Sequence, residues 1–98
     1  MVLQVAVFKP RDIEKALLSK GFQVEHTHHE YFWLYYNGKR THIKTRISHG
    51  KKEYGPSLIS AIKKQLKLQS KQQIEDLLNC PMSEEDYIEL LRSNGEVD

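Results

Sequence analysis

The sequence predicts an α+β domain in which a three-stranded antiparallel β-meander carries two helices on one face. Residues 22–48 contain three successive segments rich in β-forming side chains, and the dipeptide Asn37-Gly38 separates the second from the third. Apolar residues at helical spacing lie on both sides of this region, at 10–20 and at 57–68. The expected order is therefore helix, strand, strand, strand, helix, followed by a C-terminal helical pair.

The two helices beside the sheet have recognisable ends. Pro10 suits a first helical turn, and Gly21 suits the left-handed position that follows a helix, so one helix is expected over 10–20. The other is expected over 57–68, with Ser57 as its N-cap. Core positions at helical spacing are Ile13, Leu17, Leu18, Leu58, Ile59, Ile62 and Leu66.

The C-terminal residues 69–98 predict two more helices. Ser70 and Ser83 each begin a capping-box pattern, and apolar side chains that need burial follow both. We therefore expect residues 1–68 to form the core of the domain and residues 69–98 to pack on that same domain as an extension.

Composition limits the class of protein. The 98 residues suffice for one modest core, and 39% hydrophobic with 29% charged residues is ordinary for a soluble protein. The single cysteine, Cys80, excludes an intramolecular disulfide and fits a reducing compartment. The N-terminal run at residues 2–8, a strand or an apolar lead-in, is too short to cross a bilayer and has no basic segment before it. We expect a cytoplasmic protein without membrane contact.

The net charge of +2 conceals an uneven distribution. Residues 39–71 carry ten basic residues and one acid, whereas residues 72–98 carry one basic residue and eight acids. A concentrated basic segment indicates a polyanionic partner. Charge alone leaves a second interpretation open, in which the basic and acidic segments pair within the fold. The acidic C-terminal helices can shield the basic face, form a homodimer or only cover the core.

The strand residues sort into two faces. Alternation in 22–26 directs Phe22, Val24 and His26 toward the core. Asn37-Gly38 predicts a type I′ turn, which pairs Tyr35 with Arg40 and, by continuation, Trp33 with His42. The core face of the hairpin then collects Phe32, Leu34, Tyr36, Thr41, Ile43 and Ile47. The opposite, outer face collects Tyr31, Trp33, Tyr35, Arg40, His42, Lys44 and Arg46.

The outer face interleaves aromatic rings and cations, as in proteins that bind single-stranded nucleic acid. Further candidates for phosphate contact are Lys51 and Lys52 in the loop after the hairpin, and Lys63 and Lys64 on the helix that follows. Three other interpretations stay open. The pairs across the strands are also good sheet chemistry without a ligand, the lysines are equally suited to a solvated surface, and a protein partner fits an exposed aromatic patch.

Four segments resemble the HicA toxin family, small ribonucleases of bacterial and archaeal toxin–antitoxin pairs. They are KALLSKGF at 15–22, THHEYF at 27–32, NGKRTHI at 37–43 and HGKKEYGPSLISAIKKQLKL at 49–68. The resemblance implies a fold like that of double-stranded-RNA-binding domains, cleavage of messenger RNA without metal or cofactor, and a small antitoxin protein as partner. The chain departs from the family where Gly-Ser before the histidine is replaced by His26-Thr27.

By position in the resemblance, His28 matches the catalytic histidine of the family. An imidazole titrates near neutral pH and can take the proton from a ribose 2′-hydroxyl, which then attacks the adjacent phosphorus. His29, His42 or His49 would be the second proton-transfer group. The cations expected to hold the phosphate are Lys44, Arg46, Lys51 and Lys52.

Other functions remain open for the same residues. A non-catalytic RNA- or DNA-binding module, or a protein-interaction domain, is compatible with this fold. His26, His28 and His29 are also compatible with an exposed polar strand end. A metal site formed by these three histidines is a further alternative, although no Cys or acidic residue has the spacing typical of a zinc site.

Overall fold

The computed structural model describes residues 8–27, 29–48, 53–79 and 82–97. The N-terminal run expected as a strand or lead-in therefore lies outside it up to residue 7, as do His28, His49, Lys51, Lys52 and Cys80. The elements are α1 (Pro10–Ser19), β1 (Phe22–His26), β2 (Glu30–Tyr36), β3 (Lys39–Ile47), α2 (Pro56–Gln65), α3 (Lys71–Asn79) and α4 (Glu84–Ser93). The predicted α+β class is confirmed.

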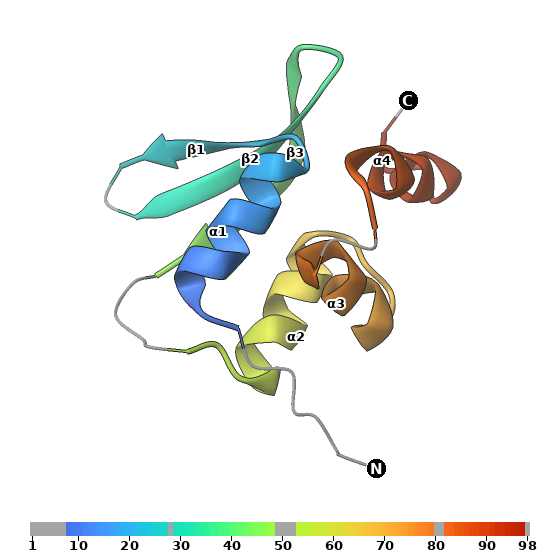
Figure 1. The fold of residues 1–98 in the computed structure, drawn as a ribbon. Helices are drawn as coiled ribbons and strands as arrows, with labels where there is room; N and C mark the ends of the chain where they lie inside the picture. Colours follow the sequence, from blue (N-terminus) through green and yellow to red (C-terminus); the bar gives the residue numbers. More distant parts are fainter. Residues whose placement is uncertain (1–7, 28, 49–52, 80–81, 98) are drawn as a thin grey trace.

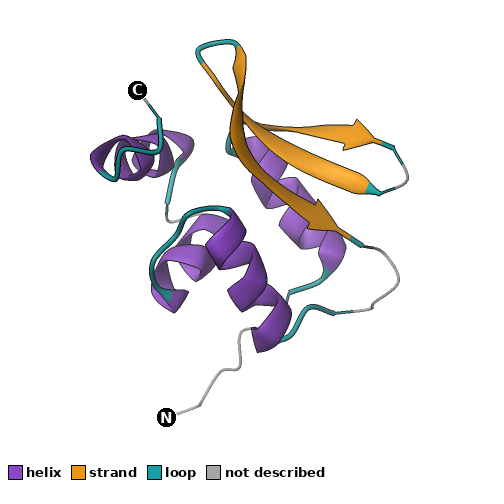
Figure 2. Ribbon diagram, turned by 180° about the vertical axis from the view of Figure 1, so that it is seen from behind, coloured by secondary structure: helices purple, strands orange, loops and turns teal. Residues whose placement is uncertain are grey.

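The three strands form one antiparallel sheet in the order β1-β2-β3. Helix α1 packs against β1 and helix α2 against β3, both on the same face of the sheet (Figure 1; Figure 2 shows the reverse side). The opposite face carries no helix from the part of the chain that the structure describes. This two-layer arrangement leaves one sheet face for the core and one for solvent or a partner.

The hairpin turn has the predicted conformation. Asn37 and Gly38 have φ values of 54° and 75°, which a type I′ turn requires. The turn sets the expected pairs Tyr36–Lys39 and Tyr35–Arg40.

Beyond these pairs the predicted register is wrong. Trp33 pairs with Lys44 instead of His42, because an irregularity between Trp33 and Tyr35 inserts extra residues of β3. The hydroxyl of Thr41 stabilises this irregularity, donating to the Leu34 carbonyl at 2.8 Å and accepting from the Ile43 amide at 3.1 Å. Because the displacement is two residues, each side chain keeps its predicted face.

Burial confirms the division of the hairpin into two faces. Phe32, Leu34, Ile43 and Ile47 are buried in the core, and so is Thr45 between the last two. Two expected core positions are wrong. Leu18 is 49% exposed because it follows the fully buried Leu17 around the helix. His26 is exposed, and its Nδ1 lies 2.9 Å from the Glu30 carboxylate, which holds the ring at the surface.

Helix α2 begins and ends differently from the prediction. Its N-cap is Gly55 and its first residue is Pro56, so Ser57 is not the cap. A proline is accommodated at the first helical position because the amide there needs no partner within the helix. The helix ends at Gln65, and Lys67 then takes a left-handed φ of 64°.

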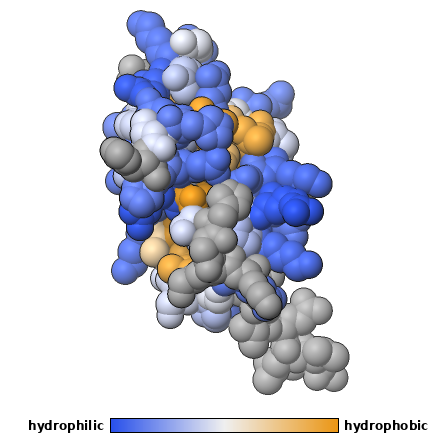
Figure 3. Space-filling model, turned by 90° about the vertical axis from the view of Figure 1, so that its left-hand side faces the viewer, coloured by the Kyte–Doolittle hydropathy of each residue, from blue (hydrophilic) through white to orange (hydrophobic). Residues whose placement is uncertain are grey.

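The C-terminal helices share the core of the sheet. Ser83 forms the predicted capping box with Asp86, whereas at Ser70 only the hydroxyl contact to the Gln73 amide is made. The apolar side chains of α3 and α4 belong to one continuous cluster with those of α1, α2 and the strands. Within the described ranges, no helix has the length and apolar character that crossing a membrane requires. On the face shown in Figure 3, hydrophilic residues cover most of the described surface.

Candidate nucleic-acid interface

The outer face of the sheet brings together the predicted aromatic and basic side chains of β2 and β3. Arg40, His42, Lys44 and Arg46 are exposed, whereas the aromatic side chains between them are half-buried. The three half-buried rings are Tyr31, Trp33 and Tyr35. Positive charge is therefore the outermost feature of this face, with aromatic rings beneath it.

The cations lie over the rings. The Arg40 guanidinium carbon is 4.2 Å from the centroid of the Trp33 ring. The Lys44 ammonium is 4.7 Å from the same ring and 5.2 Å from that of Tyr31. Cation–π contacts of this length orient long side chains that would otherwise sample many rotamers. The register shift produces this cluster, because it places Lys44 directly opposite Trp33.

One carboxylate lies within this cationic cluster. Glu25 on β1 accepts a hydrogen bond from the Trp33 indole nitrogen at 3.2 Å and pairs with Arg40 at 3.4 Å. The prediction from sequence overlooked Glu25, although its outward position follows from the alternation that buries Phe22. Glu25 thus fixes the edge of the indole and neutralises part of the charge of Arg40 on this face.

The histidines that the structure describes do not form one group. His29 is exposed, and its ring meets that of Tyr31 edge-on at 6.5 Å. His42 lies at the level of Leu34. Leu34 is roughly 16 Å from His29 along the strand, at about 3.3 Å per residue, so the two histidines are far apart. The structure thus brings His29 to the cationic face but does not place His42 beside it as a second proton-transfer group. His28 and His49 are outside the described residues.

Two hydrogen bonds from Thr27 hold the backbone of His29 in place. The Thr27 amide and hydroxyl donate to the His29 carbonyl, at 3.1 Å and 3.2 Å respectively. Thr27 stands where the family that these residues resemble has a serine. His29 directly precedes β2, and its ring lies at the end of the outer face where Tyr31 and Arg46 pair.

The basic residues of α2 lie apart from the outer face. Lys63 and Lys64 occupy the last turn of a helix that packs on the core side of the sheet. The structure therefore does not unite them with Lys44 and Arg46 on one flat surface. Lys51 and Lys52 lie outside the described ranges, so the cations that the structure assembles are those of β3.

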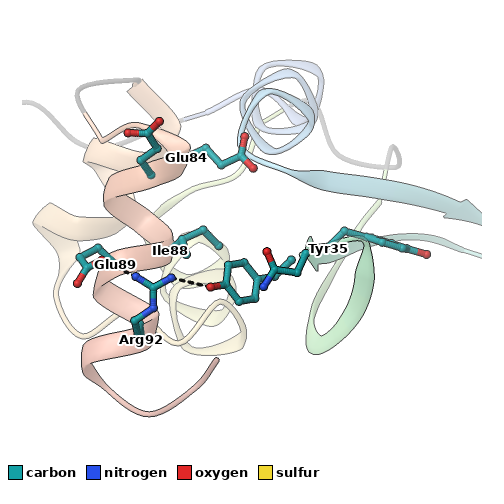
Figure 4. A pocket seen from close by; sticks show the side chains of 8 residues that line it. Tyr35, Glu84, Ile88, Glu89 and Arg92 are labelled. Carbon is teal, nitrogen blue, oxygen red and sulfur yellow. Dashed lines mark hydrogen bonds and ion pairs between the residues drawn. The ribbon is translucent and has the colours of Figure 1, made fainter. Parts of the chain in front are cut away.

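At the hairpin tip, Tyr36 of the core face meets the acidic helix α4. Figure 4 shows Arg92 of α4 near the hairpin, where its guanidinium donates to the Tyr36 hydroxyl at 2.6 Å and pairs with Glu89 at 2.7 Å. The hydrogen bond to Tyr36 is the largest cause that raises the pKa of Arg92. A pocket of about 460 Å³ at this contact is also lined by Glu84 and Glu85. Three glutamates around one pocket repel phosphate, so they limit an anion-binding surface at this end.

A second acidic contact comes from the segment after α4. The Glu96 carboxylate lies 3.1 Å from Nε2 of His42. A Schellman turn positions it, with the Glu96 amide donating to the Leu91 carbonyl at 2.8 Å. His42 was predicted to contact nucleic acid, yet here it contacts a carboxylate of the same chain. The acidic composition of the C-terminal residues is visible in the sequence, but it does not predict this pair.

Among the residues that the structure describes, no group of three His, Cys, Asp or Glu side chains is arranged to hold a metal ion. The comparisons with protein-family models, with curated proteins and with solved structures found no match to this chain. The resemblance to HicA toxins stays a prediction. The outer face and the residues beside it are therefore the features of this chain that indicate a function.

Proposed function

We propose that this protein binds single-stranded RNA through the outer face of its sheet. The observation that supports this proposal is the stacked order of side chains, with exposed cations above half-buried rings. Phosphates would meet Lys44 and Arg46 first, since these are outermost. Unpaired bases would then stack on the rings of Tyr31, Trp33 and Tyr35. Bases paired within a duplex are not available for this contact.

A salt titration tests this proposal. A fluorescein-labelled oligouridine is bound to the full chain, and its anisotropy is measured over a range of salt concentrations. Each phosphate contact on a single strand contributes about −0.7 to the slope of log affinity against log salt. Replacing Arg40, Lys44 and Arg46 by glutamine should therefore make the slope shallower by about 2.

Lys15→Gln is the matched control, because Lys15 is an exposed lysine on α1 and α1 lies on the other side of the sheet. It should leave the slope unchanged. Trp33 is the single tryptophan of the chain, so its fluorescence reports directly on the outer face. If RNA binds without changing that fluorescence, or if the triple variant keeps the parental slope, the outer face is not the binding surface.

A second function, cleavage of the bound RNA, is favoured by the position of His29. Its ring contacts that of Tyr31, over which the Lys44 ammonium lies at 5.2 Å. An imidazole is thus close to the cations that would hold phosphate. Together with the resemblance of residues 27–32 to HicA toxins, this supports a HicA-like endoribonuclease with His28 as base and His29 as second proton-transfer group.

The proposed cleavage needs no metal. The imidazole takes the proton of the 2′-hydroxyl, the 2′-oxygen attacks phosphorus, and the 5′-oxygen leaves with a proton from an acid. The products are a 2′,3′-cyclic phosphate and a 5′-hydroxyl. Single His28→Ala and His29→Ala variants should each slow chelator-resistant cleavage by about two orders of magnitude or more. Equal rates in the parent and the His28→Ala variant would refute this role, and binding without cleavage would leave an RNA-binding module.

A further inference from the structure

A pocket lies where the outer face turns around the free edge of β3 toward α2. It has a volume of about 520 Å³, within the range of pockets that hold small ligands. Residues from the sheet, from the segment after it and from α2 line it: Tyr31, Arg46, Ser48, Tyr54, Leu58, Ala61, Ile62 and Gln65.

The pocket is continuous with the proposed RNA-binding face. Tyr31 and Arg46 pair directly across β2 and β3, and both belong to that face. On the other side, Leu58, Ala61 and Ile62 follow one stripe of α2 and give an apolar wall. Ala61 is exposed although it belongs to this stripe, so the wall is open to a ligand.

The polar lining is held in place by the fold. The Tyr54 hydroxyl accepts a hydrogen bond from the Ser48 amide at 2.7 Å and donates to the Ser48 carbonyl at 3.1 Å. The Gln65 side-chain oxygen accepts a hydrogen bond from the buried Thr45 hydroxyl. The amide nitrogen of Gln65 still carries two N–H donors. Walls that are positioned before binding reduce the entropy cost of holding a ligand.

The positive charge of the lining favours a ligand that carries a phosphate. Among the described residues that line the pocket, Arg46 is the one charged side chain and none is acidic. Arginine binds phosphate through paired N–H donors, while an apolar wall and a tyrosine ring suit a flat base.

We propose that this pocket holds one nucleotide of the bound RNA, with its base against the α2 wall and Tyr31 and its phosphate on Arg46. The proposal rests on the proposed function, because the rest of the strand would lie on the outer face. The position of His29 links the pocket to the proposed cleavage. Its ring contacts Tyr31, so a nucleotide held here would lie close to the proposed proton-transfer group.

A titration followed by amide NMR tests the pocket in the full chain. The probes are uridine 5′-monophosphate and, as a ligand without a base, ribose 5-phosphate. The nucleotide should shift the amides of Ser48, Tyr54 and Gln65, and it should bind about tenfold more tightly than ribose 5-phosphate, as expected for one stacked base. Equal affinities for both probes would overturn the proposal, and so would shifts confined to β1 and β2.

A variant with a larger side chain at Ala61 fills the pocket and tests the proposal. Ala61→Leu adds bulk at an exposed helical position with little change in helix propensity, and Ser93→Leu adds the same group on α4 as a control. Ala61→Leu should weaken nucleotide binding about tenfold, whereas the control should not. Ala61→Gln repeats the test with a polar side chain if the leucine variant does not fold.

The two proposals fail differently. If oligouridine binds with the expected salt slope but Ala61→Leu binds both ligands like the parent, the pocket proposal is wrong and the outer face stands. If uridine 5′-monophosphate binds in the pocket but oligouridine shows no binding to the outer face, the pocket proposal stands and the proposed function is wrong.

Discussion

The phenol of Tyr87 on α4 donates a hydrogen bond of 2.7 Å to the carbonyl of Leu66, the C-cap residue of α2. The ring is fully buried and stacks on Phe22 of β1 at 5.9 Å between centroids. One side chain from the C-terminal helix therefore contacts both the sheet and the end of the helix that supports β3. The C-terminal extension is joined to the core through this residue.

Tyr87→Phe should lower the free energy of unfolding by about 1–3 kcal/mol, because it leaves the Leu66 carbonyl without its donor in the core. Urea denaturation of both proteins measures the difference. Tyr35→Phe removes a hydroxyl from the half-exposed outer face and should change stability by less than about 0.5 kcal/mol. Equal effects of the two substitutions would show that the Tyr87 hydrogen bond contributes nothing specific.

Alkaline pH should remove the stabilisation that Tyr87 provides. Burial, with a smaller contribution from the charge of Glu96, raises the pKa of Tyr87 above its usual value. An unfolded chain releases this proton above about pH 10 while the folded chain keeps it, so stability is complete below that pH and falls above it. The stability difference between parent and Tyr87→Phe should shrink above pH 10, at up to about 1.4 kcal/mol per pH unit. A constant difference up to pH 11 would contradict this.

Thr41→Val should destabilise the hairpin where the register shifts. The variant loses the hydroxyl that bonds the Leu34 carbonyl and the Ile43 amide, and we expect a loss of about 1–2 kcal/mol. Thr41→Ser keeps the hydroxyl and should recover most of that loss. Cross-strand NMR contacts between Trp33 and Lys44 report the register directly. Their persistence in the valine variant at parental stability would show that the hydroxyl does not hold the shift.

Lys67→Gly should stabilise the protein by about 0.5–1 kcal/mol. Lys67 has φ 64° in the turn where the Leu68 amide bonds the Lys63 carbonyl, a position that glycine occupies without strain. Lys67→Ala removes the same charge but keeps the strained conformation, so it should give no gain. Thermal unfolding of the three proteins separates the effect of backbone strain from that of charge.

Glu96→Gln should strengthen RNA binding about two- to fivefold, since exposed ion pairs of this kind are worth up to about 1 kcal/mol. The Glu96 carboxylate lies 3.1 Å from His42, beside the cations of β3, where it would compete with the phosphates of a bound RNA. Glu75→Gln removes an acid that pairs with Lys71 on α3 and should leave RNA affinity unchanged. Anisotropy with labelled oligouridine measures both, and equal effects would indicate only a change in net charge.

The element order and the two faces of the hairpin followed from local patterns. Alternation fixes which side chains of β2 and β3 share a face, and Asn37-Gly38 fixes the start of their pairing. The shift at Thr41 escaped prediction because side-chain periodicity is insensitive to a displacement of two residues. The start of α2 was also mispredicted, since Ser57 and Gly55 are both acceptable caps and Pro56 suits the first helical position after Gly55.

The sequence alone determined the α+β class, the turn at Asn37-Gly38 and the aromatic and basic composition of the outer face, because each depends on residues close together in the chain. Only the tertiary structure decided which groups meet across longer separations. It placed Lys44 over Trp33, Glu25 beside Arg40 and Glu96 beside His42. It also formed the pocket between β3 and α2. Such contacts depend on strand register and helix docking, which are set by packing of the whole core.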